Sequence, residues 1–526
     1  MANPPFVWDA KATSTGLSVL EQSNNELLRA LKDLVNNFHG VERSAEYYDL
    51  VAGDWLMSFS HSVFAAWSEA LAGAESYLPS PIPEIRDTHH FSTVFVTVDW
   101  YRHLSWAVEQ QLLGQTVEKW SIAPASLGHE NIKSKTFSSW LKQIIFTPNP
   151  EVLLISPDFK IPMQERIGLL LSWRGWVMSE DLWNSISNRS VCDWTWRKKQ
   201  STARRPYSSD FVSIARALMP LYVPCALLEG LEECRVAALS LNLPRPRKVF
   251  SGNALYCNLA FKLLFAEWRQ DGSRLLYHQH GGGYGLELNN ACEKYELRLA
   301  DKFFSWGWQR EGASIVPLSP AMPALKRNSF SDRTLLICVD LPRVPYRLMH
   351  TPMPGTIEVM HRNTCEFLTE FPNKMSLTVR PYPHDYGWGT LESMRAAAPE
   401  ANFDSHNGIF SLYESSRLVV CSYLGTSWLE ALGLNIPTVC FFDPTVYVFR
   451  EDSSDLMVAL KNVGILHYSG KDAARFIANL NDDPEGWWAQ LDVQEARANF
   501  VSKYANFSTD WKAQWKMELR RAMDEE

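Results

Sequence analysis

The sequence predicts an α/β protein in which two Rossmann-like domains face each other across a cleft, with a helical N-terminal region and C-terminal helices. In both halves of the 526-residue chain, short strand-like apolar runs alternate with segments of helix length, the order that builds parallel sheets. The runs are continuously apolar, which indicates strands covered on both faces. Because a single core rarely grows past about 250–300 residues, the length favours two domains.

The first half begins with helices and continues with strands. Apolar residues recur at helical spacing over residues 24–71, which predicts a mainly helical opening. Strand-like runs follow at 91–100, 151–159, 247–256, 274–280 and 301–308. The segment 194–210, WTWRKKQSTARRPYSSD, concentrates basic side chains in a polar setting. We expect it to be an exposed loop, either simply solvated or in contact with an anionic acceptor or headgroup.

Residues 312–332 are rich in proline, serine and small residues, which predicts the interdomain linker. The second half has strand-like runs at 333–342, 374–383, 417–423, 436–442 and 463–468, with helices expected near 356–371 and 427–434. Two more helices are expected after residue 484, and these could cross back onto the first half. The predicted divisions are a helical or mixed region at 1–150, a first Rossmann-like domain at 151–325, a second Rossmann-like domain at 332–483 and C-terminal helices at 484–526.

Bulk composition narrows the classes of function. The 51 basic and 59 acidic residues give a net charge of −8, so a broad positive surface for nucleic acid is not expected. Nine cysteines without a CxxC pair indicate reduced, buried thiols and a cytoplasmic protein. We find no signal peptide and no apolar run of about 20 residues, so we expect no membrane span. Peripheral association with the inner face of a membrane is compatible with this. The 21 tryptophans are core anchors or platforms for sugar rings.

The first chemical motif is RLLYHQHGGGYG at 274–285. An apolar strand runs directly into glycines that allow a ligand to approach the backbone. His280 follows the carboxyl end of this strand, where open α/β sheets bind ligands, so it is a candidate acid, base or phosphate donor. The alternative is a tight glycine turn with a hydrogen-bonded histidine. Together with Trp388 of the second motif, the residues expected to line the cleft are Asn253, Gln279, Gly281, Gly282 and Tyr284.

The second motif, SLTVRPYPHDYGW at 376–388, has the same strand-then-loop form. Two prolines prevent continued strand pairing, so polar side chains project from a stiff loop. Arg380 is a candidate phosphate ligand, and the adjacent pair His384 and Asp385 is a candidate for proton transfer. Trp388 is expected to line the cleft. The alternative is a purely structural, salt-bridged loop.

The third motif is CSYLGTSWLEALGLNIPTV at 421–439. A strand ends near Ser422, and Gly425, Thr426 and Ser427 open a helix whose free N–H groups and dipole favour a phosphate. Glu430 lies one turn into this helix and is a candidate ligand of a ribose hydroxyl. The alternative is a helix capped by Thr426 or Ser427.

The motifs that are missing also guide the interpretation. The sequence contains no Walker loop, GxGxxG after a first strand, GxSxG elbow, HExxH or Asp-x-Asp triplet. We therefore expect no metal and no cofactor other than a nucleotide-sugar co-substrate. Arginine and a helix N-terminus would offset the charge of the leaving group.

Several motifs, in this order along the chain, resemble a family of transferases encoded in bacterial surface-carbohydrate and nonulosonic-acid gene clusters. They are VWD at 7–9, NALY at 253–256, QHGGGYG, DKFFSWGW, RPYPHDYGW and TSWLEALGLNIPTVCFFDP. The layout also resembles GT-B glycosyltransferases, including those that use CMP-activated Kdo or sialic-acid-like sugars. Gly283 stands where this family would suggest a polar residue, and SYLGTS replaces an asparagine-containing turn, which puts acceptor preference in question.

Together these features predict a metal-independent glycosyltransferase. A nucleotide-sugar donor, with a CMP-linked ulosonic acid as one candidate, would bind the second domain through Arg380 and the Thr426/Ser427 helix start. The acceptor would be a glycan, a lipid or a protein. Either His280 or the His384/Asp385 pair would be the base. The alternatives are a CDP-glycerol-type polyol-phosphate transferase and a non-catalytic carbohydrate-binding or assembly protein.

Overall fold

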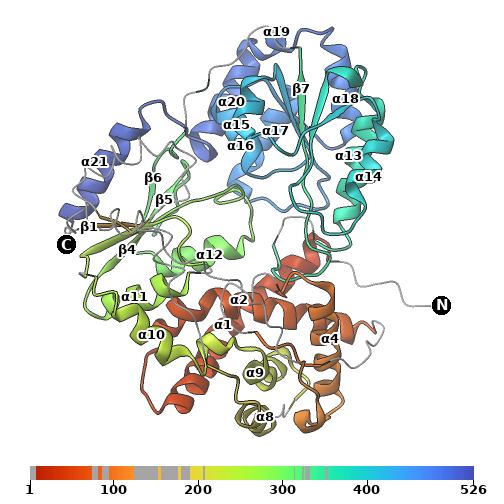
Figure 1. Ribbon diagram of the computed structural model, residues 1–526. Helices are drawn as coiled ribbons and strands as arrows, with labels where there is room; N and C mark the ends of the chain where they lie inside the picture. Colours follow the sequence, from red (N-terminus) through yellow and green to blue (C-terminus); the bar gives the residue numbers. More distant parts are fainter. Residues whose placement is uncertain are drawn as a thin grey trace.

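The computed structural model shows two six-stranded, wholly parallel sheets, each at the centre of a Rossmann-like domain (Figure 1). The predicted fold class is therefore confirmed. The structure describes residues 8–73, 81–85, 94–123, 152–155, 176–178, 190–204 and 208–525, apart from 244, 257, 313, 323–324, 326–331 and 350–352.

The first sheet has the strand order β2-β1-β3-β4-β5-β6. Its strands are β1 (Val152–Ile155), β2 (Trp176–Met178), β3 (Lys248–Ser251), β4 (Arg274–His278), β5 (Lys302–Ser305) and β6 (Ile315–Pro317). The helices that connect β3, β4 and β5 are α11 (Leu259–Gln270) and α12 (Ala291–Leu299). The central strands β3 and β4 are buried almost throughout, as the continuous apolar runs predicted.

The second sheet has the order β12-β11-β10-β7-β8-β9. Its strands are β7 (Thr334–Ile337), β8 (Leu377–Arg380), β9 (Asn402–Phe403), β10 (Leu418–Cys421), β11 (Thr438–Phe441) and β12 (Leu466–His467). Its helices are α13 (Ile357–Glu370), α14 (Thr390–Ala397), α15 (Ile409–Glu414), α16 (Thr426–Gly433), α17 (Ser454–Asn462) and α18 (Gly470–Asn479). The strand order reverses between β7 and β10. Ligands of open α/β sheets bind beyond the carboxyl ends of the strands at such a switch point.

A helical layer lies below both domains in Figure 1. It contains α1 (Ala10–His39), α2 (Ala45–Leu71), α4 (Val98–Leu112), α8 (Trp194–Ala203), α9 (Phe211–Tyr222) and α10 (Leu231–Leu239). The central helix α2 is buried continuously over residues 47–66. Its buried Asp54 accepts a 2.6 Å hydrogen bond from Lys262 of α11; pairing is what permits two charges in this interior. Short 3-10 turns are η1 (Val117–Lys119), η2 (Cys225–Leu227), η3 (Lys374–Ser376) and η4 (Glu451–Ser453).

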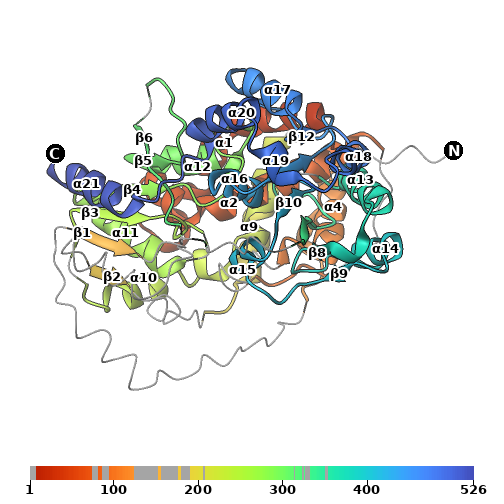
Figure 2. The same cartoon turned by 90° about the horizontal axis from the view of Figure 1, so that it is seen from above.

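The chain ends with α19 (Pro484–Trp488), α20 (Leu491–Tyr504) and α21 (Trp511–Asp524). Helix α20 packs on the second domain, whereas α21 lies against the first sheet, as both views show (Figures 1 and 2). Apolar side chains at helical spacing, Trp511, Trp515, Leu519 and Ala522, form this contact with the sheet. The chain thus crosses back from the second domain and ties the two domains together.

Trp515 anchors this crossing, and we expect its replacement by alanine to release α21. The side chain is fully buried, lies 5.2 Å from the Phe250 ring, and donates a 2.7 Å hydrogen bond from Nε1 to the Ser319 carbonyl. Trp515→Ala should lower the free energy of unfolding by about 3–5 kcal/mol, measured by urea denaturation. Met517→Ala on the same helix is the control, because Met517 is 62 % exposed; equal losses in both variants would contradict this role for Trp515.

Two predicted elements were wrong. The described part of the strand predicted at 91–100 contains the start of α4, because Thr97 caps that helix by accepting from the Trp100 N–H; N-capping and the acidic Asp99 in the first turn outweigh the β-branched composition. The exposed loop predicted at 194–210 begins with α8. Its Arg197 is buried in a bidentate ion pair with Glu229, so this basic side chain is not solvated.

The stretch 312–332, predicted as a linker, contains a sixth strand, β6, at its start. The described cysteines are free, and all but the partly exposed Cys365 are buried, in agreement with the expectation of buried thiols. Among the described helices, none combines length with enough apolar character to cross a bilayer.

Candidate functional site

The glycine loop after β4 touches the start of α16 at the junction of the two domains. The Gly282 N–H donates a 3.0 Å hydrogen bond to Thr426 Oγ1. A Cβ on Gly282 would lie 2.5 Å from the carbonyl carbon of Gly425 and 2.7 Å from the Thr426 nitrogen, so only glycine allows this approach. The structure therefore brings the first and third sequence motifs together, both of which follow strand ends.

The α16 N-terminus has the form of an anion site. Helix α16 begins at Thr426 and its N-cap residue is Gly425, which has no side chain to cap the helix. The alternative of a helix capped by Thr426 or Ser427 is thus not what the structure shows. N–H groups of the first turn and the helix dipole favour negative charge at this end. Thr426 and Ser427 are both partly exposed.

Glu430 lies deeper than the sequence suggested. Its side chain is buried, and its Oε2 is 3.1 Å from the Tyr413 hydroxyl, which is also 3.0 Å from the Ser427 carbonyl oxygen. This contact fixes the first turn of α16 against α15. A contact between Glu430 and a ribose hydroxyl stays a prediction.

His280 lies beside a buried carboxyl group. His280 Nδ1 is 3.5 Å from Glu296 Oε1 on α12, and 27 % of the His280 side chain is exposed. The same Oε1 accepts 2.8 Å hydrogen bonds from the hydroxyls of Tyr256 and Tyr284. Burial raises the pKa of Glu296 well above its ordinary value, and the hydrogen bonds from the two tyrosines act in the opposite direction. Two tyrosines thus hold a carboxyl group against the ring of a candidate base.

Two residues predicted to line the cleft have other roles. Gln279 is 1 % exposed; its Oε1 accepts from the Trp306 N–H and from Trp308 Nε1, and its Nε2 donates to the Gly281 carbonyl. Its amide holds the glycine loop to the end of β5. Tyr284 is buried and supports Glu296. Both side chains are therefore engaged by the protein itself, as buried polar groups usually are, and a lining role for either stays a prediction.

Asn253 lies in the turn after β3 and is partly exposed. Its carbonyl accepts a 3.1 Å hydrogen bond from the Tyr256 N–H, which shapes the turn that presents Tyr256 to Glu296. The rings of Tyr256 and His280 are 5.9 Å apart. A role for the Asn253 side chain toward a ligand stays a prediction.

The second motif forms a loop after β8 that is mostly exposed. Arg380 donates a 2.5 Å bond to the Asn407 carbonyl. Asp385 accepts from the Gly387 N–H rather than from His384, whose ring lies 4.4 Å from that of Tyr386. The structure therefore does not pair His384 with Asp385.

Trp388, at the end of this loop, donates a 2.8 Å bond to the Leu341 carbonyl and lies under the Arg343 guanidinium. This ties the β8 loop to the β7 loop at the switch point. Of the second motif, Arg380 and Trp388 are therefore placed next to strand ends of the second sheet.

Sequence reasoning missed Glu296 and Arg347. Glu296 occurs in ACEKYELRL, which reads as an ordinary amphipathic helix, and only the fold turns it inward. Arg347 occurs in an irregular segment after β7. Only Arg347 could have been singled out from the sequence. It lies in a long loop after a strand at the switch point, and residues that contact ligands are often found in such loops.

Glu287, in the loop after the glycines, makes the stability of the folded protein depend on pH. Burial, with a smaller effect of Glu293, raises its pKa from 4.5 to about 8. The folded state therefore keeps a proton that the unfolded state releases, so this stabilisation is complete below about pH 4.5 and is lost as the pH rises to 8. We expect Glu287→Gln to gain stability relative to the wild type at pH 8.5, on the order of 1–3 kcal/mol, with no such gain at pH 4.5.

The measurement is the melting temperature across pH 4.5–8.5. Exposed Glu311 supplies the control, Glu311→Gln, which should follow the wild type at every pH. Parallel curves for the wild type and Glu287→Gln would show that Glu287 does not carry this proton.

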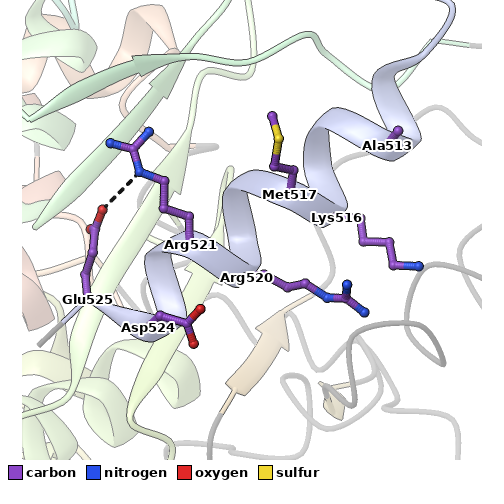
Figure 3. A pocket seen from close by; sticks show the side chains of 7 residues that line it. All are labelled: Ala513, Lys516, Met517, Arg520, Arg521, Asp524 and Glu525. Carbon is purple, nitrogen blue, oxygen red and sulfur yellow. Dashed lines mark ion pairs between the residues drawn. The ribbon is translucent and has the colours of Figure 1, made fainter.

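A possible metal-binding cluster and a surface hollow do not belong to the candidate functional site. Cys192, Cys225 and Glu229 lie close enough to hold a metal ion, but both carboxylate oxygens of Glu229 bind Arg197. A hollow of about 620 Å³ is lined by one face of α21 and by Glu525 (Figure 3). Its walls come from a single stretch of mostly charged side chains, and it contains none of the strand-end residues.

Comparison with known proteins identifies the family of this chain. Residues 2–519 match the family described as LIC12162 family transferase. The chain belongs to the LIC12162 family of transferases. No curated protein sequence matches this LIC12162 family transferase.

Three solved structures with a similar fold share little sequence identity with this LIC12162 family transferase. TarM is 13 % identical with a TM-score of 0.37, and the match covers 56 % of this chain and 58 % of TarM, so the chain spans little more than half of that protein. The rhamnosyltransferase SpnG, complexed with spinosyn aglycone, is 12 % identical, with a TM-score of 0.35 and coverage of 71 % and 100 %. MurG of Acinetobacter baumannii is 10 % identical, with a TM-score of 0.33 and coverage of 71 % and 100 %. Such likenesses concern the fold alone.

Proposed function

We propose that this transferase moves a sugar from a nucleotide-sugar donor to a hydroxyl group of an acceptor, with His280 as the base. The observation that carries the proposal is the contact between the glycine loop and the α16 start, Gly282 N–H to Thr426 Oγ1. It places an uncapped helix N-terminus, suited to a phosphate, in the same junction as a histidine backed by a carboxyl group.

The donor phosphate binds at the α16 start and the acceptor lies on the side of the first domain. The acceptor hydroxyl attacks the anomeric carbon and its proton passes to the His280 imidazole. The bond from the anomeric carbon to the phosphate oxygen breaks, and the oxygen leaves with the electron pair. The α16 dipole and first-turn N–H groups stabilise the charge that develops on this leaving group.

Glu296 is a positioning residue in this scheme. Its Oε1, held by two tyrosine hydroxyls, lies where it can accept a hydrogen bond from Nδ1–H once the ring is protonated. His384 has no such partner among the described residues, since Asp385 is engaged with the Gly387 N–H. Of the two bases left open by the sequence, His280 has the better supported geometry.

We propose the donor and the acceptor only as chemical classes. A nucleotide-sugar with a mono- or diphosphate leaving group suits the α16 start, and a CMP-activated ulosonic acid is one member of that class. Surface glycans, lipids and proteins are the acceptors that the sequence resemblance suggests. No metal is assigned a role, because the chain lacks an Asp-x-Asp triplet and a helix N-terminus can offset leaving-group charge.

The test is a thermal-shift screen of the full chain with CMP, CDP, UDP, GDP and dTDP. A ligand that binds only the folded state raises the melting temperature, and a concentration 100 times Kd adds about 2.7 kcal/mol. We expect one nucleotide to stabilise the protein and Ser427→Pro, which removes a first-turn N–H, to abolish the shift. A transfer assay with that nucleotide's sugars, with and without EDTA, then tests the reaction.

Each outcome has a consequence. Retained turnover in EDTA supports metal-independent transfer, and a product that contains phosphorus would assign the CDP-glycerol-type reaction instead. Binding of sugars without any nucleotide response would overturn the proposal in favour of a carbohydrate-binding protein.

A further inference from the structure

Arg347 reaches from the second domain into the region of the proposed base. It lies in the segment after β7, at the switch point of the second sheet, and the residue is intermediate in burial. Its guanidinium lies 5.4 Å from the centre of the Tyr256 ring. Tyr256 in turn donates to Glu296 and has its ring 5.9 Å from that of His280. One tyrosine therefore contacts both the guanidinium and the proposed base.

The polar contacts of this guanidinium are few and long. Nε is 3.4 Å from Ser58 Oγ on α2, and one terminal nitrogen is 3.8 Å from Cys292 Sγ on α12. No carboxylate lies within 4.0 Å of Arg347 in the described ranges. A guanidinium offers five N–H donors in a planar fork, so most of its capacity is not used by these neighbours.

The nearest titratable groups form no direct ion pair with Arg347 among the described residues. Asp54, which interacts with Arg347 at longer range, is paired with Lys262 at 2.6 Å. Burial raises the pKa of Glu296, while the charge of Arg347 acts on it in the opposite direction without a direct ion pair. Burial also lowers the pKa of His61 to about 3, and its Nδ1 accepts from the Leu348 N–H. Arg347 thus has no direct ion-pair partner among the described residues at the junction.

We infer that Arg347 recognises an anionic oxygen group, a carboxylate or a phosphate, on the sugar or acceptor unit that reacts at His280. The planar fork matches both groups in a bidentate manner. The contacts of Arg347 lie on the first domain and α2, not on the α16 start, so the group belongs to the reacting unit rather than to the donor's leaving group. This inference rests on the proposed function, and it restricts the substrate class to acidic units.

The experiment is ligand-observed saturation-transfer NMR on the full chain, with four probes. They are N-acetylneuraminic acid, its methyl ester, glycerol 3-phosphate and N-acetylglucosamine. We expect signals from the free acid at least tenfold stronger than from its ester or from the neutral sugar, and their loss in Arg347→Met. Signals from glycerol 3-phosphate alone, lost in the same variant, would assign the anion to a phosphate.

Two further variants keep the result interpretable. Arg347→Lys retains the charge but not the fork, so it should fold and bind the acid about tenfold more weakly. Arg216→Met removes an exposed arginine that pairs with Glu26 on the helical layer and should bind like the wild type. Equal signals from acid and ester in the wild type, or undiminished acid signals in Arg347→Met and Arg347→Lys, would overturn the inference.

The nucleotide screen separates this result from the proposed function. If a nucleotide still stabilises Arg347→Met but no anionic probe binds the wild type, the inference fails and the transferase proposal stands. If anionic probes bind through Arg347 and no nucleotide binds, the transferase proposal fails while the anion site is real.

Discussion

Replacing His280 by alanine is expected to lower kcat for sugar transfer by 10²–10⁴-fold, the range typical for loss of a general base. The nucleotide-induced thermal shift should be unchanged, because His280 lies beside Glu296 on the first domain rather than in the α16 turn. Steady-state transfer kinetics together with the shift assay give both quantities. A drop in kcat without a loss of donor binding identifies a residue that acts in the chemical step.

Two companion variants refine this test. Glu296→Gln should lower kcat by roughly tenfold, the effect of about 1.4 kcal/mol, and should change the pH dependence of kcat, which a merely structural residue would not do. His384→Ala should keep most of the turnover, since its ring packs on Tyr386 and its neighbour Asp385 is engaged elsewhere. If His384→Ala loses activity and His280→Ala keeps it, the base is on the β8 loop.

Replacing Gly282 by alanine is the second large effect that we expect. The added Cβ would meet three backbone atoms of Gly425 and Thr426 at 2.5–2.8 Å, and backbone cannot rotate away as a side chain can. The glycine loop and α16 must therefore separate. We expect a loss of roughly 1–3 kcal/mol in the free energy of unfolding, with loss of the nucleotide shift and a fall in transfer of more than about 100-fold.

Control glycines are available for this substitution. Gly281→Ala, one residue earlier, would place its Cβ 3.4 Å from Thr426 Oγ1, an ordinary contact, and Gly408→Ala has no atom within 4 Å. Both should keep the melting temperature of the wild type. A Gly282→Ala protein that melts and binds nucleotide normally would show that the loop contact at 3.0 Å is not needed for the site.

Local patterns predicted most of the sheet architecture. Runs such as LLICVD and LVVCSY became β7 and β10 because a strand buried on both faces needs continuous apolar side chains. The same reasoning failed at 91–100, where Thr97 caps α4, and at 194–210, where Arg197 finds a buried partner, Glu229. In both cases a specific contact outweighed average composition.

The sequence by itself determined the two parallel sheets, the strand ends that carry His280 and Thr426, and the phosphate-compatible start of α16, because each follows from apolar patterning and glycine placement over a few residues. Only the tertiary structure decided which polar groups meet. His280 gains Glu296 through α12, and Arg347 reaches Ser58, 289 positions earlier in the chain. Such pairs depend on packing between elements distant in sequence, and local periodicity carries no information about them.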